Sequence, residues 1–175
     1  MGRMQTIFSA VEEAKVISGM KWTDVAARMG MTYQNLRHSL SRDDCKMLVT
    51  RKIVWAMGMR LEYFIGVPGL SLVEQEERAV WMKNYEKANP EGNNFFVYEQ
   101  FRTSLVGETL SSLLQGCGIP YQSFMTCMHV GDIRVSWLDA LARQAGMCLY
   151  FFCLSDQDAE KGLEFPFYRK DSKSV

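Results

Sequence analysis

The 175-residue sequence has few of the residues on which enzymatic chemistry, metal binding and membrane insertion depend. It contains only two histidines, His38 and His129, which leaves little material for a metal site or a Ser/His/Asp triad. No apolar run approaches the roughly 20 residues that a membrane-spanning helix needs. We therefore expect a protein that is not an enzyme, holds no metal or cofactor and does not insert into a membrane.

The cysteines and the N-terminal segment exclude further classes of protein. The five cysteines are odd in number and form no CxxC pair, so neither a zinc knuckle nor a disulfide framework is indicated. The segment MGRMQTIFSAVEEAK has acidic residues where a secretory signal peptide would be apolar. These features predict a cytoplasmic protein with buried thiols at Cys45, Cys117, Cys127, Cys148 and Cys153.

The formal net charge is zero, yet the charge is distributed unevenly along the chain. Residues 1–66 contain ten Lys or Arg against six Asp or Glu, a net charge of +4, and the rest of the chain carries the compensating −4. A polyanionic partner is therefore expected at the N-terminal third.

The sequence repeats itself when it is shifted by 88 residues, so that MGMTYQNLRHSL aligns with CGIPYQSFMTCM without a gap. The identical pairs include Gly30/Gly118, Tyr33/Tyr121, Gln34/Gln122, Gly58/Gly146 and Phe64/Phe152. Apolar positions correspond as well, which is expected when one hydrophobic core is built twice. The chain is predicted to contain two copies of one small helical domain.

Each copy is expected to form short helices separated by glycines, because its apolar residues recur at helical spacing. In the first copy we expect helices near 5–18, 22–29, 33–41 and 47–57. A connecting helix is expected over 73–88, with a buried stripe formed by Val73, Val80, Trp81 and Tyr85. The segment MRLEYFIG at the end of the first copy is compatible with a short strand or with a helical turn.

The end of the second copy, MCLYFFCL, is an aromatic run typical of a strand, and LEFPFYR follows it after a polar segment. This pattern favours a terminal β-hairpin. The expected fold class is mainly α, with tandem helix-turn-helix domains, a connecting helix and a small C-terminal β-hairpin. The expected boundaries are 1–66 for the first copy, 67–94 for the connecting segment, 95–154 for the second copy and 155–175 for the tail.

In the first copy MKWTDVAARMG is followed by MTYQNLRHSLSR and then by KMLVTRKIVWAMGM. This order resembles the Cro and lambda-repressor type of helix-turn-helix domain, also called the XRE family, over about residues 5–66. Ala26 would let the second and third helices cross closely, and Gly30 would supply the turn between them. The second copy is similar to the family more weakly, over 93–154.

The resemblance implies that the third helix enters the major groove of double-stranded DNA. Base contacts are then expected from Tyr33, Gln34, Asn35, Arg37 and His38, because Gln and Asn suit adenine and Arg suits guanine. Contacts to phosphates are expected from Lys21, Thr32, Arg42, Lys46, Arg51 and Lys52. A polar third helix is also typical of any solvated helix, and Tyr33 and Gln34 recur in the second copy, where they can serve the fold.

The second copy departs from the pattern. Leu114 replaces the small alanine, Pro120 opens the third helix, and that helix has no Lys or Arg. A helix without cations is a poor reader of DNA. An exposed face with Met125 and Met128 would instead suit a protein partner, unless both methionines are core residues.

These features predict a sequence-specific DNA-binding regulator, a repressor of the kind found in phages and other mobile elements. We expect a homodimer assembled through residues beyond about 70, with the aromatic strand and the tail offering an edge for pairing between subunits. A pseudo-dimer within one chain is less favoured, because the second copy lacks cations on its third helix. The alternative function is a protein-binding inhibitor of the antirepressor or anti-CRISPR type.

Overall fold

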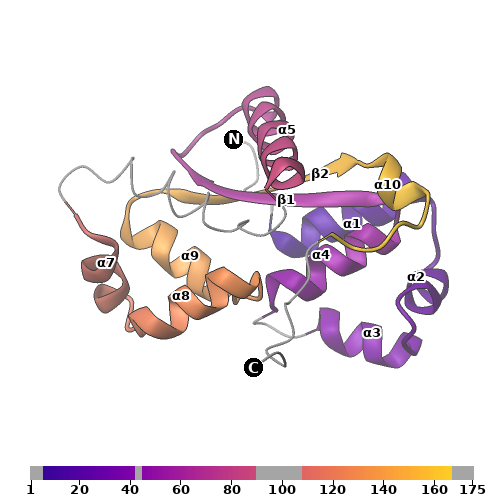
Figure 1. The fold of residues 1–175 in the computed structure, drawn as a ribbon, viewed down its shortest axis with the longest axis horizontal. Coiled ribbons are helices and arrows are strands. Elements are labelled where there is room, and N and C mark those ends of the chain that lie inside the picture. Colours follow the sequence, from indigo (N-terminus) through magenta and orange to yellow (C-terminus); the bar gives the residue numbers. More distant parts are fainter. Residues whose placement is uncertain (1–5, 42–44, 90–107, 167–175) are drawn as a thin grey trace.

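The computed structural model describes residues 6–41, 45–89 and 108–166. It is mainly helical, as expected, and its helices cover both faces of a two-stranded antiparallel sheet (Figure 1). The long helix α5 lies on one face, and α1, α4 and α9 pack against the other (Figure 1). Within the described ranges, each helix is too short or too polar to cross a membrane.

The first copy contains four helices and a strand close to the predicted positions. They are α1 (Ile7–Ser18), α2 (Trp22–Arg28), α3 (Tyr33–Leu40), α4 (Met47–Ala56) and β1 (Met59–Gly66). Thr6 caps α1 by accepting a hydrogen bond from the backbone N–H of Ser9, 3.2 Å away. The segment MRLEYFIG, whose sequence is compatible with a strand or a helical turn, is therefore a strand.

The second copy repeats this order. It contains α7 (Leu110–Gly116), α8 (Tyr121–Val130), α9 (Val135–Gln144) and β2 (Cys148–Ser155), followed by the short helix α10 (Gln157–Glu160). Gly30 and Gly118 occupy the same turn before the third helix, with φ of 65° and 69°. Because side chains disfavour this left-handed conformation, the two glycines give both copies the same turn. The counterpart of α1, at 95–106, lies outside the described residues.

The sheet joins the two copies. Strand β2 pairs with β1, and Tyr63 lies opposite Phe151, its counterpart at the 88-residue shift. The 88-residue shift also relates two other pairs of the sheet: it aligns Leu61 with Leu149 and Ile65 with Cys153, so the pair Leu61–Cys153 is equivalent to the pair Ile65–Leu149. The register therefore has a pseudo-two-fold axis through its centre.

The expected small antiparallel β-structure is present at the end of the second copy, but β2 pairs with β1 instead of a strand that follows it. The expected partner LEFPFYR covers 163–169, of which 163–166 follow α10 without forming a strand and 167–169 lie outside the described residues. Pro166 has no backbone N–H to offer a partner strand, whereas β1 supplies eight buried residues.

A second contact between the copies obeys the same symmetry. The backbone N–H of Met47 donates to the carbonyl of Ile133 at 2.9 Å, and that of Val135 donates to the carbonyl of Cys45 at 3.0 Å. These bonds flank a bridge between Lys46 and Arg134, which are again counterparts. One pseudo-two-fold relation thus describes both the strand pairing and the contact at the starts of α4 and α9.

The two copies share one hydrophobic core. Its buried residues come from both copies and form a single cluster around the sheet. Helix α1 packs against β2 of the other copy, where the thiol of Cys153 donates to the carbonyl of Ala10 at 3.4 Å. The predicted boundary at residue 66 therefore does not separate two cores. The five cysteines form no disulfide and are half-buried rather than fully buried.

The connecting helix is present as α5 (Leu72–Ala88), and a capping box of Ser71 and Glu74 begins it. The predicted buried stripe is wrong, because Val73 and Trp81 are 65% and 47% exposed. The buried residues of α5 are Ala79, Met82 and Glu86.

Glu86 is buried because it completes a cluster of charged side chains beneath α5. One of its carboxylate oxygens lies 2.6 Å from Nη2 of Arg51 and 2.6 Å from Nη2 of Arg60. Both arginines also bond to Glu62 on β1. Pairing offsets the desolvation of each charge, so the cluster depends on every member being present.

Replacing Glu86 with alanine should destabilise the protein by about 3–5 kcal/mol, because Arg51 and Arg60 would stay buried with too little negative charge. Urea unfolding followed by circular dichroism measures the change. Glu76→Ala, at an exposed position of the same helix, is the control and should change stability by less than about 0.5 kcal/mol. Equal effects of the two substitutions would contradict this account.

The cluster also predicts a pH dependence of stability. Burial and the carboxylate of Glu86 raise the pKa of Glu62 to about 8, against the opposing effect of Arg51 and Arg60. The folded protein then holds this proton between about pH 4.5 and 8 while the unfolded chain releases it, so stability should fall as the pH rises through that window.

The free energy of unfolding, measured in urea at several pH values across this window, should fall by more in the wild type than in Glu62→Gln. The difference should be on the order of a few kcal/mol, because glutamine does not titrate. Parallel curves for the two proteins would show that Glu62 does not carry the effect.

Candidate nucleic-acid interface

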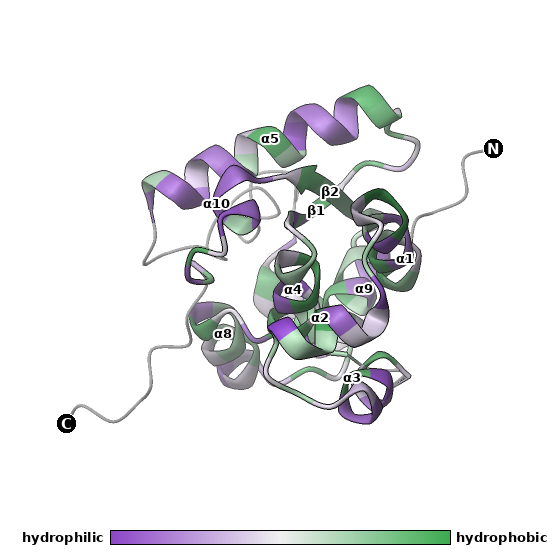
Figure 2. Ribbon diagram, turned by 90° about the vertical axis from the view of Figure 1, so that its right-hand side faces the viewer, coloured by the Kyte–Doolittle hydropathy of each residue, from purple (hydrophilic) through white to green (hydrophobic). Residues whose placement is uncertain are grey.

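Helix α3 exposes the residues predicted to contact bases. Of its eight residues Leu36 is the buried one, and it anchors the helix to the core. The other faces of α3 are mostly hydrophilic (Figure 2). The exposed side chains include Tyr33, Gln34, Asn35, Arg37 and His38.

The start of α3 is fixed by local interactions. Thr32 caps the helix, and its hydroxyl oxygen accepts a hydrogen bond from the backbone N–H of Asn35 at 3.2 Å. Val25 and Ala26 of α2 are buried, which allows the two helices to pack closely across the turn at Gly30. Thr32 therefore caps the helix, and the N-terminus of a helix favours an anion such as a phosphate.

The cations predicted to contact phosphates have different environments. Lys21 is exposed at the start of α2. The side chain of Lys46 is 49% exposed and forms an ion pair with Asp132 at 3.2 Å. Lys52 is exposed on α4, with its ammonium 6.0 Å from the ring centre of Phe165. Arg42 lies outside the described residues.

The prediction for Arg51 is wrong. Its side chain is 3% exposed and is bound by Glu62 and Glu86, so it cannot reach a phosphate. Arg51 lies on the face of α4 that packs against β1, where its Nε donates to the carbonyl of Leu61 at 3.1 Å. Arg51 stabilises the fold.

Helix α8 of the second copy presents a polar surface rather than a methionine face. Met128 is 4% exposed and Met125 is half-buried against the core, so the predicted contact through these methionines is wrong. Phe124 and Met128 are one helical turn apart and both face the core. The exposed residues of α8 include Tyr121, Gln122, Ser123, Thr126 and His129.

The third helices of the two copies lie on the same side of the molecule. Both α3 and α8 are on the side of the sheet away from α5 in two perpendicular views (Figures 1 and 2). Tyr33 and Tyr121 are each 41% exposed, as the repeat would require. The exposed Arg134 between the copies was not predicted, although the 88-residue shift aligns it with Lys46.

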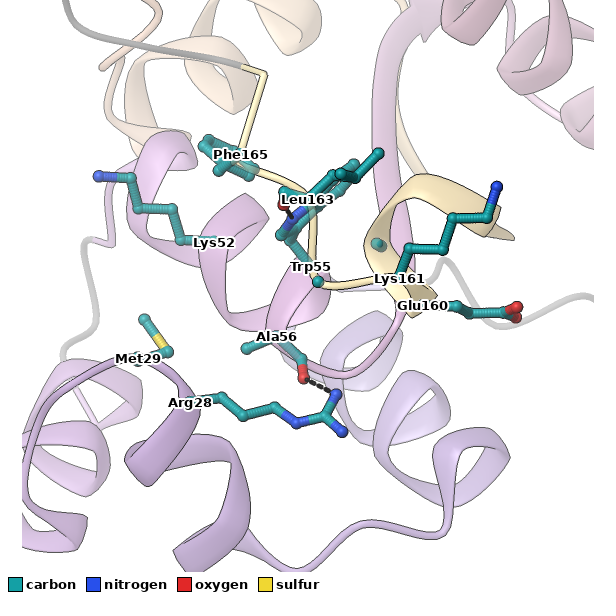
Figure 3. Close-up of a pocket in the computed structure, with 11 residues that line it drawn as sticks. Arg28, Met29, Lys52, Trp55, Ala56, Glu160, Lys161, Leu163 and Phe165 are labelled. Carbon is teal, nitrogen blue, oxygen red and sulfur yellow. Dashed lines mark hydrogen bonds between the residues drawn. The ribbon is translucent and has the colours of Figure 1, made fainter.

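A cavity of about 480 Å³ lies between the end of α2, α4 and the segment after α10 (Figure 3). The indole N–H of Trp55 donates to the carbonyl of Leu163 at 3.1 Å, and Arg28 donates to the carbonyl of Ala56 at 3.2 Å. The charged ends of Lys52 and Lys161 point away from each other (Figure 3). These cations therefore do not converge on one anion.

The described residues contain no group of His, Cys, Asp or Glu side chains that could hold a metal ion. Comparisons of the chain with protein-family models, with curated proteins and with solved structures found no match.

Proposed function

We propose that this protein binds double-stranded DNA in a sequence-specific way through α3 and acts as a transcriptional regulator, a repressor. The observation that supports this proposal is the exposed row of Gln34, Asn35 and Arg37 on a helix held by Leu36 and Thr32. These side-chain types form bidentate hydrogen bonds with base edges in the major groove. A helix fixed in this way can present them without losing much conformational entropy on binding.

The charge of the first copy also supports DNA binding. Arg51 and Arg60 are buried and are neutralised by the buried carboxylates of Glu86 and Asp156, while the buried Glu62 holds its proton at neutral pH. Residues 1–66 without Arg51, Arg60 and Glu62 have eight Lys or Arg against five Asp or Glu, which leaves a net charge of +3 for binding a polyanion.

The protein-binding inhibitor has less support in the structure than in the sequence, because Met128 is buried and Met125 is half-buried. Large apolar side chains are exposed elsewhere, at Val16 and Ile17 of α1 and at Leu72, Val73 and Trp81 of α5. These residues are where such an inhibitor would bind its partner.

The homodimer stays a prediction. The aromatic strand that was expected to pair between subunits pairs with β1 of its own chain. The edge of β2 that pairs with β1 is therefore not available to a second chain.

Substituting Gln34 or Arg37 with alanine should weaken binding to the specific site by about 1–3 kcal/mol while sparing non-specific binding. The DNA is first selected from a random pool by the full-length protein, and affinity is then measured by fluorescence anisotropy at several salt concentrations. Lys161→Ala removes an exposed cation near α10 and serves as the control, with little effect expected.

Binding to any DNA should weaken as salt rises, because cations of the protein displace counterions from the phosphates. A full-length protein without salt-dependent affinity for DNA would contradict the proposed function. Capture of a protein partner through Val16, Ile17 or the exposed residues of α5 would then favour the inhibitor.

A further inference from the structure

We infer that α8 is a second DNA-reading helix, so that one chain binds two unequal half-sites as an intramolecular pseudo-dimer. This inference rests on the proposed function. It extends DNA contact to residues of α8, which we expected from the sequence to contact a protein or to serve the fold. It starts from the geometry of the sheet, whose register is centred on Tyr63 and Phe151.

Two separate contacts fix the pseudo-two-fold axis. One is the centre of the strand pairing, and the other is the bridge of Lys46 and Arg134 with its two exchanged backbone hydrogen bonds of 2.9 and 3.0 Å. Helices α3 and α8 are counterparts under this relation, and both lie on the side of the sheet away from α5 (Figures 1 and 2). In the pseudo-dimer each helix faces one half-site, as the two recognition helices of a symmetric dimer do.

The first two residues of α3 and of α8 are identical and exposed. Tyr33 and Tyr121 are equally exposed, and Gln34 and Gln122 are exposed at the next position. A glutamine at equivalent positions can pair with adenine in each half-site. Tyr121 and Gln122 are thereby assigned as DNA contacts.

The remaining positions differ between the two helices. Arg37 aligns with Met125, which is half-buried, and His38 aligns with Thr126. The half-site under α3 should therefore include a guanine that the half-site under α8 does not require. The expected DNA site is an imperfect inverted repeat.

The lack of cations on α8 does not prevent this role. Once α3 is bound, the second helix meets its half-site at an effective concentration in the millimolar range, so that a weak contact still contributes to affinity. Lys46 and Arg134 lie on the axis between the helices and are both exposed, where phosphates between the half-sites would approach.

Selection from random DNA by the full-length protein tests the inference first. We expect two inverted half-sites about 10 base pairs apart, centre to centre, that share one base preference and differ at another. Mass measurement of the complex should find one chain per two-half-site DNA. A selected site with a single half-site, or two chains on one site, would overturn the pseudo-dimer.

The substitution Gln122→Ala then tests α8 directly. It should lower affinity for the two-half-site DNA about tenfold and leave affinity for DNA with only the α3 half-site unchanged. The matched control is Gln157→Ala, at an exposed position of α10, which should change neither affinity. Unchanged thermal unfolding of both variants shows that the fold is retained.

The outcomes separate this inference from the proposed function. If Gln34→Ala weakens specific binding and Gln122→Ala behaves as the wild type on all DNA, α3 reads DNA alone and the pseudo-dimer is overturned. If the wild type has no salt-dependent affinity for DNA, the proposed function fails and the inference fails with it.

Discussion

The pairing of β1 with β2 is the interaction on which the rest of the structure depends. A two-stranded sheet is marginally stable by itself in water, but here α5 covers one face and helices from both copies cover the other. The strands are far apart in the sequence, and their pairing brings together two segments that each carry a third helix. The common core and the positions of α3 and α8 both follow from this register.

The pseudo-symmetry is broken where α5 docks. The counterparts of Arg51, Arg60 and Glu62 in the second copy are Asp139, Cys148 and Tyr150, so the second copy has no equivalent of this charged cluster. Glu86 near the end of α5 enters this cluster. The hydroxyl of Tyr150 donates to the carbonyl of Val67 at 2.7 Å and accepts from the N–H of Leu70 at 3.2 Å, just before the helix begins.

The two ends of α5 are therefore held by different chemistry, which fixes its direction across a sheet that is otherwise nearly symmetric. A buried ionic cluster is weak evidence for stability as such, because the desolvation of each charge is costly. Its role here is better described as orientation, because it holds the end of α5 at one place on the sheet while Tyr150 holds the segment before the helix.

The helices, the repeat and the expected glycine turns could be predicted from the sequence because they depend on local spacing and capping. The strand pairing was not predicted, since the sequence pattern of a strand does not identify its partner. The repeat aligns Lys46 with Arg134, but an alignment by itself does not predict that the two residues meet as they do in the structure. The expectation for Arg51 is wrong because its partner Glu62 lies on β1, and the packing of α4 against β1 does not follow from local spacing along the chain.

Two copies in one chain can carry third helices with different surfaces, which two identical subunits cannot. In a homodimer both third helices have the same sequence. A substitution that removes a cation therefore removes it from the contacts with both half-sites. In this chain α3 keeps Arg37 while the aligned Met125 packs against the core. The core residues of the two copies must still fit one sheet, because β1 and β2 pack against helices from both copies. The exposed positions are under no such constraint, so the fold allows the two surfaces to differ while the axis between them stays fixed.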